Sequence, residues 1–490
     1  MQIELLGIIA LICGVLSWLF GGNFPAYLLF ISTLFGAGAA LILPTLGYSN
    51  IQPAHLLLGF LIIHVFFKRD YTERIFHALR FPNEGFWLVL TAGYVLLSAA
   101  VFPRFFSGST YVYTIARTAV GAGILAIPLG PSSSNVTQSV YFIGDVCCFL
   151  FFYAFSGSED GLKSMLKAAL AVVSINLGFA AVDLITYFTG TSSLLNFIRN
   201  ANYQMWNETV VVGFKRITGS FPEASTFAAT TVGLLAFSVR LCLSGIYPLL
   251  TLSLSILSFC ALVFATSSTG YVATAVLLGL LFISCLVEIV VRPVARTTMM
   301  FLILAPLTVS ALGVGVVLHQ PALDVVEDLG STMVLNKLSS SSGEERTRWN
   351  EQALRNFADT SGFGAGVGSV RASSFPVATL GSIGIFGALT YGSFLGGIFL
   401  KRKGRWRDPF GMAIQSAARA ACLGQLLAAC VAGGFIDLGL QFFIFAAMAC
   451  SGPLHTRKGL QSYLNVRISE FREIGRKAAG YADGPNTGGS

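Results

Sequence analysis

Long apolar runs separated by short polar segments fill most of the sequence. A run of about 20 apolar residues makes one membrane-spanning helix, because lipid surrounds its side chains and its backbone groups bond within the helix. The pattern predicts about thirteen spans, at 4–20, 25–47, 54–67, 85–103, 138–156, 167–190, 219–239, 243–265, 269–291, 298–318, 375–400, 411–433 and 435–452. We therefore expect an all-α fold, a polytopic transmembrane helix bundle of about 12–13 spans.

The composition excludes a soluble protein. Of the 490 residues, 54% are hydrophobic and 11% are charged, against about 45–50% and about 25% in soluble domains. Lys and Arg number 31 and Asp and Glu 23, and this net charge of +8 indicates membrane topology rather than nucleic-acid binding. The nine cysteines form no CxxC pair and no cluster with histidine, so we predict no structural zinc site and no disulfide framework. No clustered carboxylate site is visible either, and we expect no cofactor.

Basic residues gather in short segments between the spans, and the positive-inside rule places these segments in the cytoplasm. They lie at 68–80, 163–167, 240, 292–296, 401–407 and from 457 onward. Alternation then puts 104–137, 191–218, 266–269 and 319–374 on the outer side. Residues 111–130 are also apolar, but counting them as a span would invert this topology, so we predict a re-entrant or outer-surface segment there.

The first three spans are the least well defined by the pattern. Residues 1–20 lack a basic segment before their apolar run, which favours an uncleaved first span over a targeting peptide. Thirteen spans with a cytoplasmic C-terminus place Met1 on the outer side. The chain divides into a first bundle part (1–318), a periplasmic loop (319–374), a last bundle part (375–452) and a cytoplasmic amphipathic tail (453–490).

The loop at 319–374 is long enough to be functional rather than a simple connection. Helix formers over 347–357 predict a short ordered helix within it. In the tail, residues 459–475 place apolar side chains at helical spacing among basic ones, which suits a helix lying on an anionic leaflet. A solvated tail is the alternative, and residues 481–490 have the composition of a disordered end.

Three polar clusters on the predicted outer side are candidates for chemistry. In the first, Lys215 and Arg216 precede a helix whose first turns hold Glu223 and Ser225. An ordinary helix cap with two snorkelling bases is one interpretation, because an acid suits the positive end of a helix. Against it, an acid at the start of an apolar helix is costly to bury unless it has a partner or a function.

The second cluster follows a serine run and holds Arg346, Arg348 and Arg355. Arginine suits phosphate because its planar fork makes bidentate, permanently charged contacts. The alternative is a solvated helix face on which acidic residues balance the arginines.

The third cluster alternates glycines at 362–368 and ends in Arg371 and Ser373. Its glycines, Gly366 and Gly368 among them, permit tight turns and let backbone N–H groups approach an anion. As a nucleotide fingerprint the pattern is weak, because no strand precedes it. A turn that directs Arg371 back toward the membrane surface is the interpretation we favour.

The order and spacing of these clusters resemble the O-antigen ligase and Wzy-type O-antigen and exopolysaccharide polymerase superfamily, integral membrane glycosyltransferases of the GT-C kind. The resemblance covers residues 135–450. It rests on Arg216-x-x-Gly219-x-Phe221 before a span, the turn with Ser267, Thr269 and Gly270, Arg346 followed by Ala353-Leu354, and Gly364-x-Gly366-x-Gly368 leading to Gly384-Ile385-x-Gly387. The version Phe221-Pro222-Glu223-x-Ser225 is similar to the exopolysaccharide branch.

The chain departs from the ligases of this superfamily in one respect. Ligases place a functional histidine in the large outer loop, whereas here the only candidate is His319 at its start, and 371–374 stand where that histidine is expected. The departure favours a polymerase of O-antigen or exopolysaccharide repeat units over a lipid A ligase.

The resemblance implies a donor oligosaccharide on undecaprenyl pyrophosphate and an acceptor hydroxyl on a growing polysaccharide chain, in the bacterial inner membrane with the active site facing the periplasm. A chain-length regulator or export complex would be a further partner. In this interpretation Arg216, Arg346 and Arg371 stabilise the leaving pyrophosphate and Glu223 is the general base. Substrate-binding candidates are Lys215, Ser225, Arg348, Gly366, Gly368 and Ser373.

Two other classes remain open, a polysaccharide or lipid transporter and a non-catalytic scaffold. Transporters usually show related halves, broken helices and charges near the middle of the bilayer. The sequence shows no internal repeat, and its ionisable residues are predicted at span ends. An enzyme is therefore favoured.

Overall fold

The computed structural model describes residues 2–44, 49–66, 69–118, 121–202, 205–291, 295–333, 340–400 and 406–453. These residues form sixteen α-helices, namely α1 (Leu5–Phe20), α2 (Phe24–Ser32), α3 (Pro53–Phe66), α4 (Arg69–Ala78), α5 (Glu84–Phe105), α6 (Ser133–Phe155), α7 (Glu159–Phe188), α8 (Ala224–Leu243), α9 (Pro248–Phe264), α10 (Ser268–Val291), α11 (Arg296–Leu318), α12 (Gln320–Met333), α13 (Ser341–Asp359), α14 (Phe375–Leu400), α15 (Pro409–Ala432) and α16 (Leu440–Cys450). The predicted tail helix at 459–475 and the end at 481–490 lie outside the described residues.

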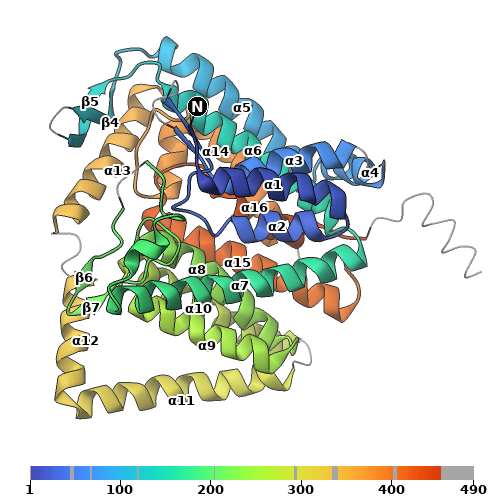
Figure 1. Cartoon of the computed structure of the whole chain (residues 1–490), viewed down its shortest axis with the longest axis vertical. Coiled ribbons are helices and arrows are strands. Elements are labelled where there is room, and N and C mark those ends of the chain that lie inside the picture. Colours follow the sequence, from blue (N-terminus) through green and yellow to red (C-terminus); the bar gives the residue numbers. More distant parts are fainter. Residues whose placement is uncertain are drawn as a thin grey trace, which may run out of the picture.

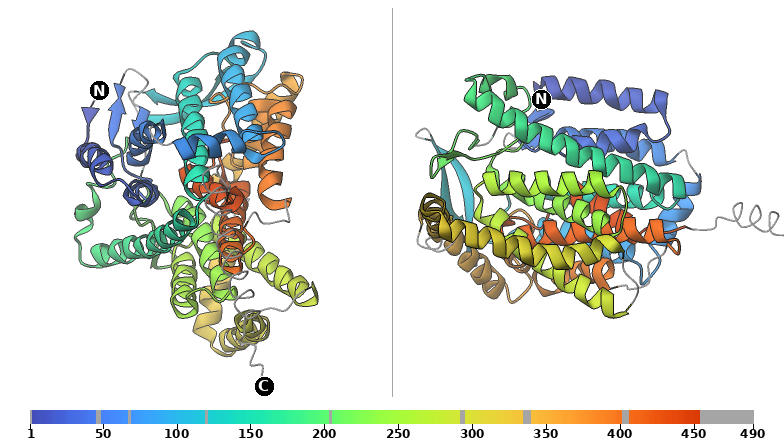
Figure 2. Two further views of the ribbon diagram at one scale, coloured as in Figure 1. Left: turned by 90° about the vertical axis from the view of Figure 1, so that its right-hand side faces the viewer. Right: turned by 90° about the horizontal axis from the view of Figure 1, so that it is seen from below.

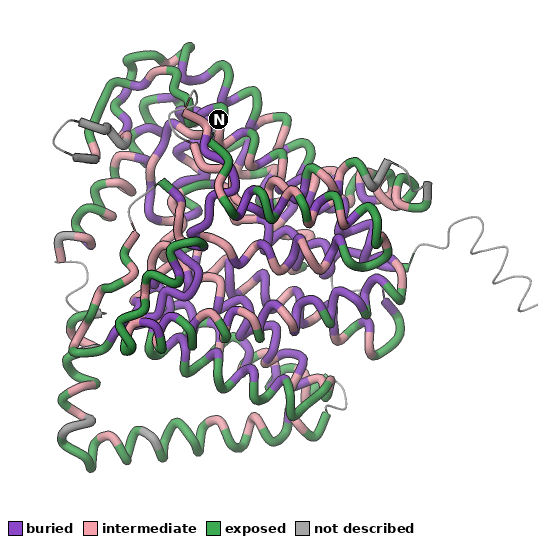
Figure 3. The backbone as a smooth tube through the Cα atoms, in the orientation of Figure 1, coloured by how far each residue is buried: buried purple, intermediate pink, exposed green. Residues whose placement is uncertain are grey.

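Eight of the helices are long and apolar enough to cross a membrane, namely α5, α6, α7, α8, α10, α11, α14 and α15. Four shorter apolar helices, α1, α3, α9 and α16, accompany them. Beyond Thr298, none of the described residues of α11 is buried, although the helix is apolar throughout. Such a helix is stable only where lipid covers it, and Figure 3 shows it as an exposed rod beside the bundle. The chain is thus helical, with the pattern of a multi-pass membrane protein.

Two predicted spans differ from the structure, and a third segment has a structure that the sequence did not predict. The run 25–47 is not one span, because α2 ends at Ser32 and the chain then forms β2 (Leu41–Leu43), which pairs antiparallel with β1 (Gln2–Ile3) and β3 (Ser49–Ile51). The last run, 435–452, is helical only over α16. The segment 111–130, predicted to be re-entrant or on the outer surface, contains an antiparallel hairpin of β4 (Tyr111–Thr118) and β5 (Gly121–Pro128).

The bundle has two distinct ends (Figures 1 and 2). One end, called the hairpin end below, carries β4 and β5, the short strands β6 (Val210–Val211) and β7 (Phe214–Lys215), and helices α12 and α13. The other end carries α4, where Arg74 Nη1 donates to Ala154 O at 2.8 Å. Segments predicted on the outer side thus lie together at the hairpin end. Glu4 lies there too, because Asn200 Nδ2 donates to its carboxylate at 3.2 Å.

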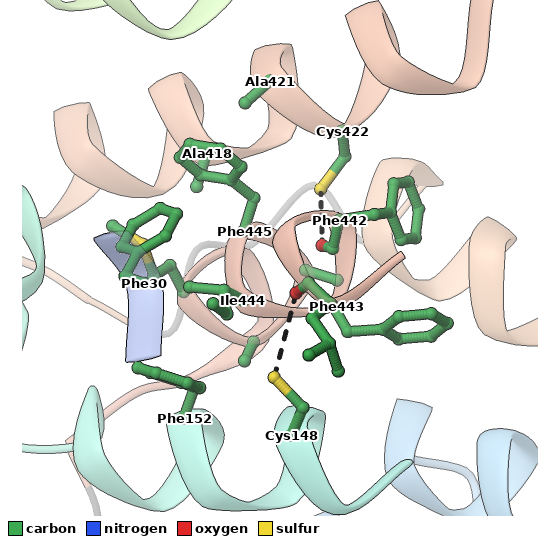
Figure 4. Close-up of a cluster of buried hydrophobic side chains, with 14 of the residues drawn as sticks. Phe30, Cys148, Phe152, Ala418, Ala421, Cys422, Phe442, Phe443, Ile444 and Phe445 are labelled. Carbon is green, nitrogen blue, oxygen red and sulfur yellow. Dashed lines mark hydrogen bonds between the residues drawn. The ribbon is translucent and has the colours of Figure 1, made fainter. Parts of the chain in front are cut away.

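Helix α16 is the centre of the bundle, and all eleven of its residues are buried. Its aromatic side chains contact rings from several helices. The ring centroid of Phe445 lies 5.2 Å from the centroids of Phe30 and Phe237, and that of Phe443 lies 6.0 Å from the centroid of Phe394. Figure 4 shows these side chains enclosed between α6 and α15. A helix covered on every side has no lipid-facing surface, so its length is set by its neighbours rather than by the bilayer.

Candidate active site at the hairpin end

Three segments far apart in the sequence bring the predicted catalytic residues together. Arg216 follows strand β7, Glu223 is the N-cap of α8, Arg346 lies in α13, and Arg371 lies in the loop before α14. Burial lowers the pKa of Arg216. The charges of Glu223 and Tyr271 oppose this shift, and the charge of Arg346 adds to it. Burial also lowers the pKa of Arg371, and Glu345 and Glu223 oppose that shift. The four side chains therefore share one electrostatic neighbourhood, called the arginine cluster below.

The arginines of this cluster lack the partners that buried cations normally have. Arg216, Arg346 and Arg371 are all half-buried, yet within the described residues none forms an ion pair or a side-chain hydrogen bond. The Nε–H groups of Arg216 and Arg371 are buried without an acceptor there. Arginine stays protonated at any physiological pH. The cluster thus holds fixed positive charge that is available to an anion.

A buried ion pair holds the segment before Glu223 in place. Asp183 in α7 accepts hydrogen bonds from Arg199 at 2.7 Å and from Lys215 at 2.8 Å. Its second oxygen also accepts from the backbone N–H groups of Thr218 and Gly219, at 2.8 and 3.1 Å. A carboxylate with this many donors is fully satisfied. It fixes the chain between Lys215 and Gly219, and so fixes Arg216.

This pair corrects the substrate-binding role predicted for Lys215. The side chain of Lys215 is 2% exposed, and its ammonium group binds Asp183 and the carbonyl oxygen of Arg216. Burial lowers the pKa of Lys215, and the hydrogen bond with Asp183 opposes that shift. Lys215 is a positioning residue, because its charge is already engaged within the protein.

Glu223 begins α8 without capping it. Its side chain makes no hydrogen bond to the helix backbone, and instead it accepts one from the hydroxyl of Ser225. Both residues are half-buried. A carboxylate that leaves the helix N–H groups alone and faces two arginines is not a simple cap. Ser225 therefore orients Glu223.

The glycine loop, residues 362–368, packs closely against α5 and α6. Gly366 is buried, its N–H donates to Ser382 O at 3.0 Å, and its φ is 92°. An added Cβ would lie 2.7 Å from Ser98 O at Gly366 and 2.3 Å from Ser134 O at Gly368. The N–H of Gly366 is thus engaged within the protein, which does not fit its predicted contact with substrate, whereas the role predicted for Gly368 stays a prediction. The loop needs glycine because α5 and α6 approach its backbone closely.

The same loop directs Arg371 onto α13. The guanidinium of Arg371 stacks over the ring of Trp349, 4.2 Å from its centroid. The N–H of Ser373 donates to Asn350 Oδ1 at 2.8 Å, and Ser373 is buried. Ser373 thus joins the loop to α13, which holds Arg346, and its buried position does not fit the direct substrate contact that we predicted.

Helix α13 separates Arg346 from its neighbour Arg348. The predicted helix at 347–357 lies within α13, whose N-cap Ser340 accepts from Gly343 N at 3.2 Å. The side chain of Arg348 is 70% exposed and lies 3.6 Å from Glu344 one turn away. Such a pair is worth little. The structure therefore leaves Arg348 on the solvated face and brings only Arg346 toward Arg216.

Sequence reasoning missed Asp183, Arg199 and Trp349. Asp183 carried a signal, because an acid within an apolar run requires a partner. Arg199 and Trp349 carried none, since each acts through a residue distant in sequence. Among the described residues no group of three or more His, Cys, Asp or Glu side chains could hold a metal ion.

No protein-family model matches the chain, and neither the curated proteins nor the solved structures include a match to it.

Proposed function

We propose that this protein is a polysaccharide polymerase that joins oligosaccharide repeat units carried on undecaprenyl pyrophosphate. The observation that carries the proposal is the arginine cluster, in which Arg216 and Arg371 interact with Glu223, Arg346 interacts with Arg216, and all three half-buried arginines lack ion pairs among the described residues. Unpaired arginines suit a pyrophosphate, and a carboxylate beside them suits an acceptor hydroxyl. The family resemblance in the sequence supports the same reaction. The location would be the bacterial inner membrane, with the cluster facing the periplasm.

The reaction needs one bond made and one broken. The acceptor hydroxyl oxygen attacks the anomeric carbon of the donor, the bond from that carbon to the pyrophosphate oxygen breaks, and the hydroxyl proton passes to Glu223. Negative charge grows on the leaving pyrophosphate, and Arg216, Arg346 and Arg371 stabilise it there. The donor already carries the driving energy in its pyrophosphate bond, so no nucleotide takes part.

An apolar groove suits the lipid tail of such a donor. It has a volume of about 760 Å³ and lies between α5 and α14, where Val89, Gly93, Leu97, Phe386 and Leu389 contribute to its wall. The ring centroid of Phe386 lies 6.0 Å from that of Phe363 in the glycine loop, and this loop leads along the chain to Arg371. A polyprenyl chain in the groove would place its pyrophosphate toward the arginine cluster.

Filling this groove is expected to weaken the use of long-chain donors. At Gly93 an added Cβ meets nothing within 4 Å, so Gly93→Phe occupies groove space without disturbing the helix. Each displaced methylene contact is worth about 0.8 kcal/mol, and losing two of them costs about tenfold in rate at low donor concentration. Chain growth with an undecaprenyl donor should fall, while a short-chain donor analogue should be unaffected. Gly178→Phe in α7, where the added Cβ also meets nothing, is the matched control. Equal loss with both donors would argue against the groove.

A transporter is the second candidate, because two observations favour it. Asp145 lies in the middle of α6, which corrects the expectation that ionisable residues sit at span ends. Helix α14 is also broken at Gly384.

A ligase that transfers the chain to lipid A is a further alternative. The acceptor that the enzyme uses distinguishes a ligase from a polymerase.

Supplying different acceptors to the purified protein tests the proposal. Protein in nanodiscs is given the lipid-linked repeat unit alone, or the repeat unit together with lipid A. A ladder of lengthened chains from the repeat unit alone supports the polymerase. Transfer only to lipid A would identify a ligase. No new glycosidic bond with either acceptor, together with uptake of lipid-linked sugar in vesicles, would identify a transporter and overturn the proposal.

A further inference from the structure

A second group of ionisable side chains lies inside the bundle, on elements other than those of the arginine cluster. Asp145 is in the middle of α6 (Ser133–Phe155) and is completely buried. Neither of its oxygens accepts a hydrogen bond from an N–H or O–H donor in the described part of the chain. An acid at this depth is costly, and such residues face a partner that gives them a function.

The partner is Asp437, which reaches this depth because α16 is short. The Sγ of Cys148, about one turn after Asp145, lies 3.8 Å from Leu440 O, where α16 begins (Figure 4). Asp437 precedes Leu440 by three residues in the non-helical segment 433–439, called the 433–439 break below. Asp145 and Asp437 are close enough to interact electrostatically.

A hydrogen bond between two carboxyl groups requires a proton. Two ionised carboxylates only accept hydrogen bonds and repel each other, so neighbouring carboxyl groups inside the bundle are stable together only when one of them is protonated. No lysine or arginine of the described chain acts on Asp145, and the other titratable groups near it are Cys148 in α6 and Tyr391 in α14. Without a nearby cation, a proton is the simplest way to remove one of the two charges.

His55 adds a base beside the same part of α6. It lies in α3, its ring is 4.7 Å from that of Tyr141, and an added Cβ at Gly144 would lie 3.4 Å from its Cδ2. Both ring nitrogens are buried without a hydrogen-bond partner among the described residues. His55 and Asp437 interact electrostatically. A half-buried imidazole whose two ring nitrogens are both unengaged can take up or release a proton.

We propose that Asp145, Asp437 and His55 form an intramembrane proton-binding site. One proton is shared between the two carboxyl groups, and on release it leaves two carboxylates and either a free proton or an imidazolium at His55. Asp437 is half-buried whereas Asp145 is fully buried, so the proton exchanges through Asp437. This site is separate from the proposed glycosyl transfer.

Release of the proton would displace the 433–439 break. Two neighbouring carboxylates repel each other in a low-dielectric interior. Asp145 is held in helix α6, whereas Asp437 lies in the non-helical 433–439 break, so the break is the element that would move. An added Cβ at Gly434 would lie 3.4 Å from Ala372 O, next to Arg371. Protonation would therefore act on a segment that packs against Ala372 and that, within the described part of the chain, makes no hydrogen bond or ion pair with the arginines themselves.

Infrared spectroscopy of the purified chain in nanodiscs tests the site without reference to any enzymatic activity. A protonated carboxylic acid has its own C=O stretching band, which an ionised carboxylate lacks. We expect a band at about pH 7, where ordinary Asp and Glu are ionised, that is lost in Asp145→Asn. The exposed residue Asp160 gives the matched control, and Asp160→Asn should keep the band.

Other variants and salts define what would overturn the proposal. Asp437→Asn should shift the frequency of the band, because the remaining acid keeps its burial but changes its hydrogen-bond partner. Each variant is first checked for a wild-type elution profile, so that loss of the band is not loss of fold. Absence of an Asp145-dependent band from the wild type at about pH 7 contradicts a shared proton. A band that sodium abolishes and choline does not would show a metal-cation site in place of a proton site.

Discussion

Asp183 and Glu223 are two carboxylates at the same end of the bundle with opposite environments. Asp183 is 2% exposed and binds Arg199, Lys215 and two backbone N–H groups. Glu223 is half-buried, and the hydroxyl of Ser225 is its hydrogen-bond donor. The carboxylate of Asp183 is fully occupied by contacts within the protein, whereas the carboxylate of Glu223 can still bind a substrate group. Substituting each by its amide should therefore affect different properties.

Asp183→Asn should lower stability, and Glu223→Gln should lower activity. Removing the charge of Asp183 leaves two buried cations without a partner, which costs about 3–5 kcal/mol. Removing the charge of Glu223 costs only about 0.3–1 kcal/mol as a helix-end interaction, but about a hundredfold or more in rate if it is the general base. Thermal unfolding and single-turnover product formation measure the two effects. A Glu223→Gln variant that works at the wild-type rate would show that the acceptor hydroxyl needs no carboxylate.

The sequence predicts individual site residues only where their chemistry is visible locally. Arg216, Glu223, Arg346 and Arg371 stand out because charged residues are rare in this chain, and the structure brings all four together. The roles of Lys215 and Arg348 could not be assigned, because they depend on Asp183 and on which face of α13 points inward. Neither property can be read from neighbouring residues.

At the scale of elements, the glycine loop shows why one pattern supports two interpretations. Alternating glycines with positive φ can expose N–H groups to an anion or can let a backbone pass close to its neighbours. Here Ala365 N and Gly366 N donate to Gly381 O and Ser382 O, at 2.8 and 3.0 Å. The loop is therefore a rigid support that fixes Arg371 against Trp349.

Gly366→Ala should reduce stability and activity together. Its φ of 92° is unfavourable for any residue with a side chain, and the new Cβ would lie 2.7 Å from Ser98 O. Strain of this kind costs about 1–3 kcal/mol. Gly178→Ala, in an open position of α7, is the control and should be neutral or slightly stabilising. If Gly366→Ala keeps full stability but loses donor binding, the loop binds the anion directly.

Element boundaries were predictable where an apolar run is a single helix, and not elsewhere. Apolarity alone does not distinguish a helix from the strands of a hairpin, which is why the second half of 25–47 differs from prediction and why the strands within 111–130 could not be foreseen. The short helix α16 could not be foreseen, because its length follows from complete enclosure by other helices.

At the scale of the whole molecule, the distribution of basic residues agrees with the two ends of the bundle. The segments 104–137 and 319–374 meet at the hairpin end, where Gln352 Nε2 donates to Tyr111 O at 2.8 Å and Asn135 Nδ2 to Val367 O at 2.6 Å. The positive-inside rule acts on the whole chain during insertion, so this level of organisation is readable from sequence. The side of the membrane is a separate question.

Reporter fusions should place the hairpin end outside the cytoplasm. A reporter fused after Ser340, at the start of α13, should be active only when exported, and one fused after Lys403, in the basic segment between α14 and α15, only when cytoplasmic. If the fusion after Ser340 reports the cytoplasm, the arginine cluster faces nucleotides rather than exported lipid-linked sugars, and the proposed reaction loses its substrate.

Chain growth by arginine variants tests the central claim most directly, namely that the arginine cluster binds a pyrophosphate through geometry as well as charge. Arg371→Lys keeps the charge but cannot reproduce the planar fork, and each lost charge-assisted contact costs about 1.5–3 kcal/mol, or about ten- to a hundredfold in rate. Arg348→Lys on the exposed face of α13 is the matched control. With purified protein and lipid-linked repeat units, the account predicts a normal product ladder from Arg348→Lys and a strongly reduced one from Arg371→Lys. Equal, wild-type ladders from both variants would contradict it.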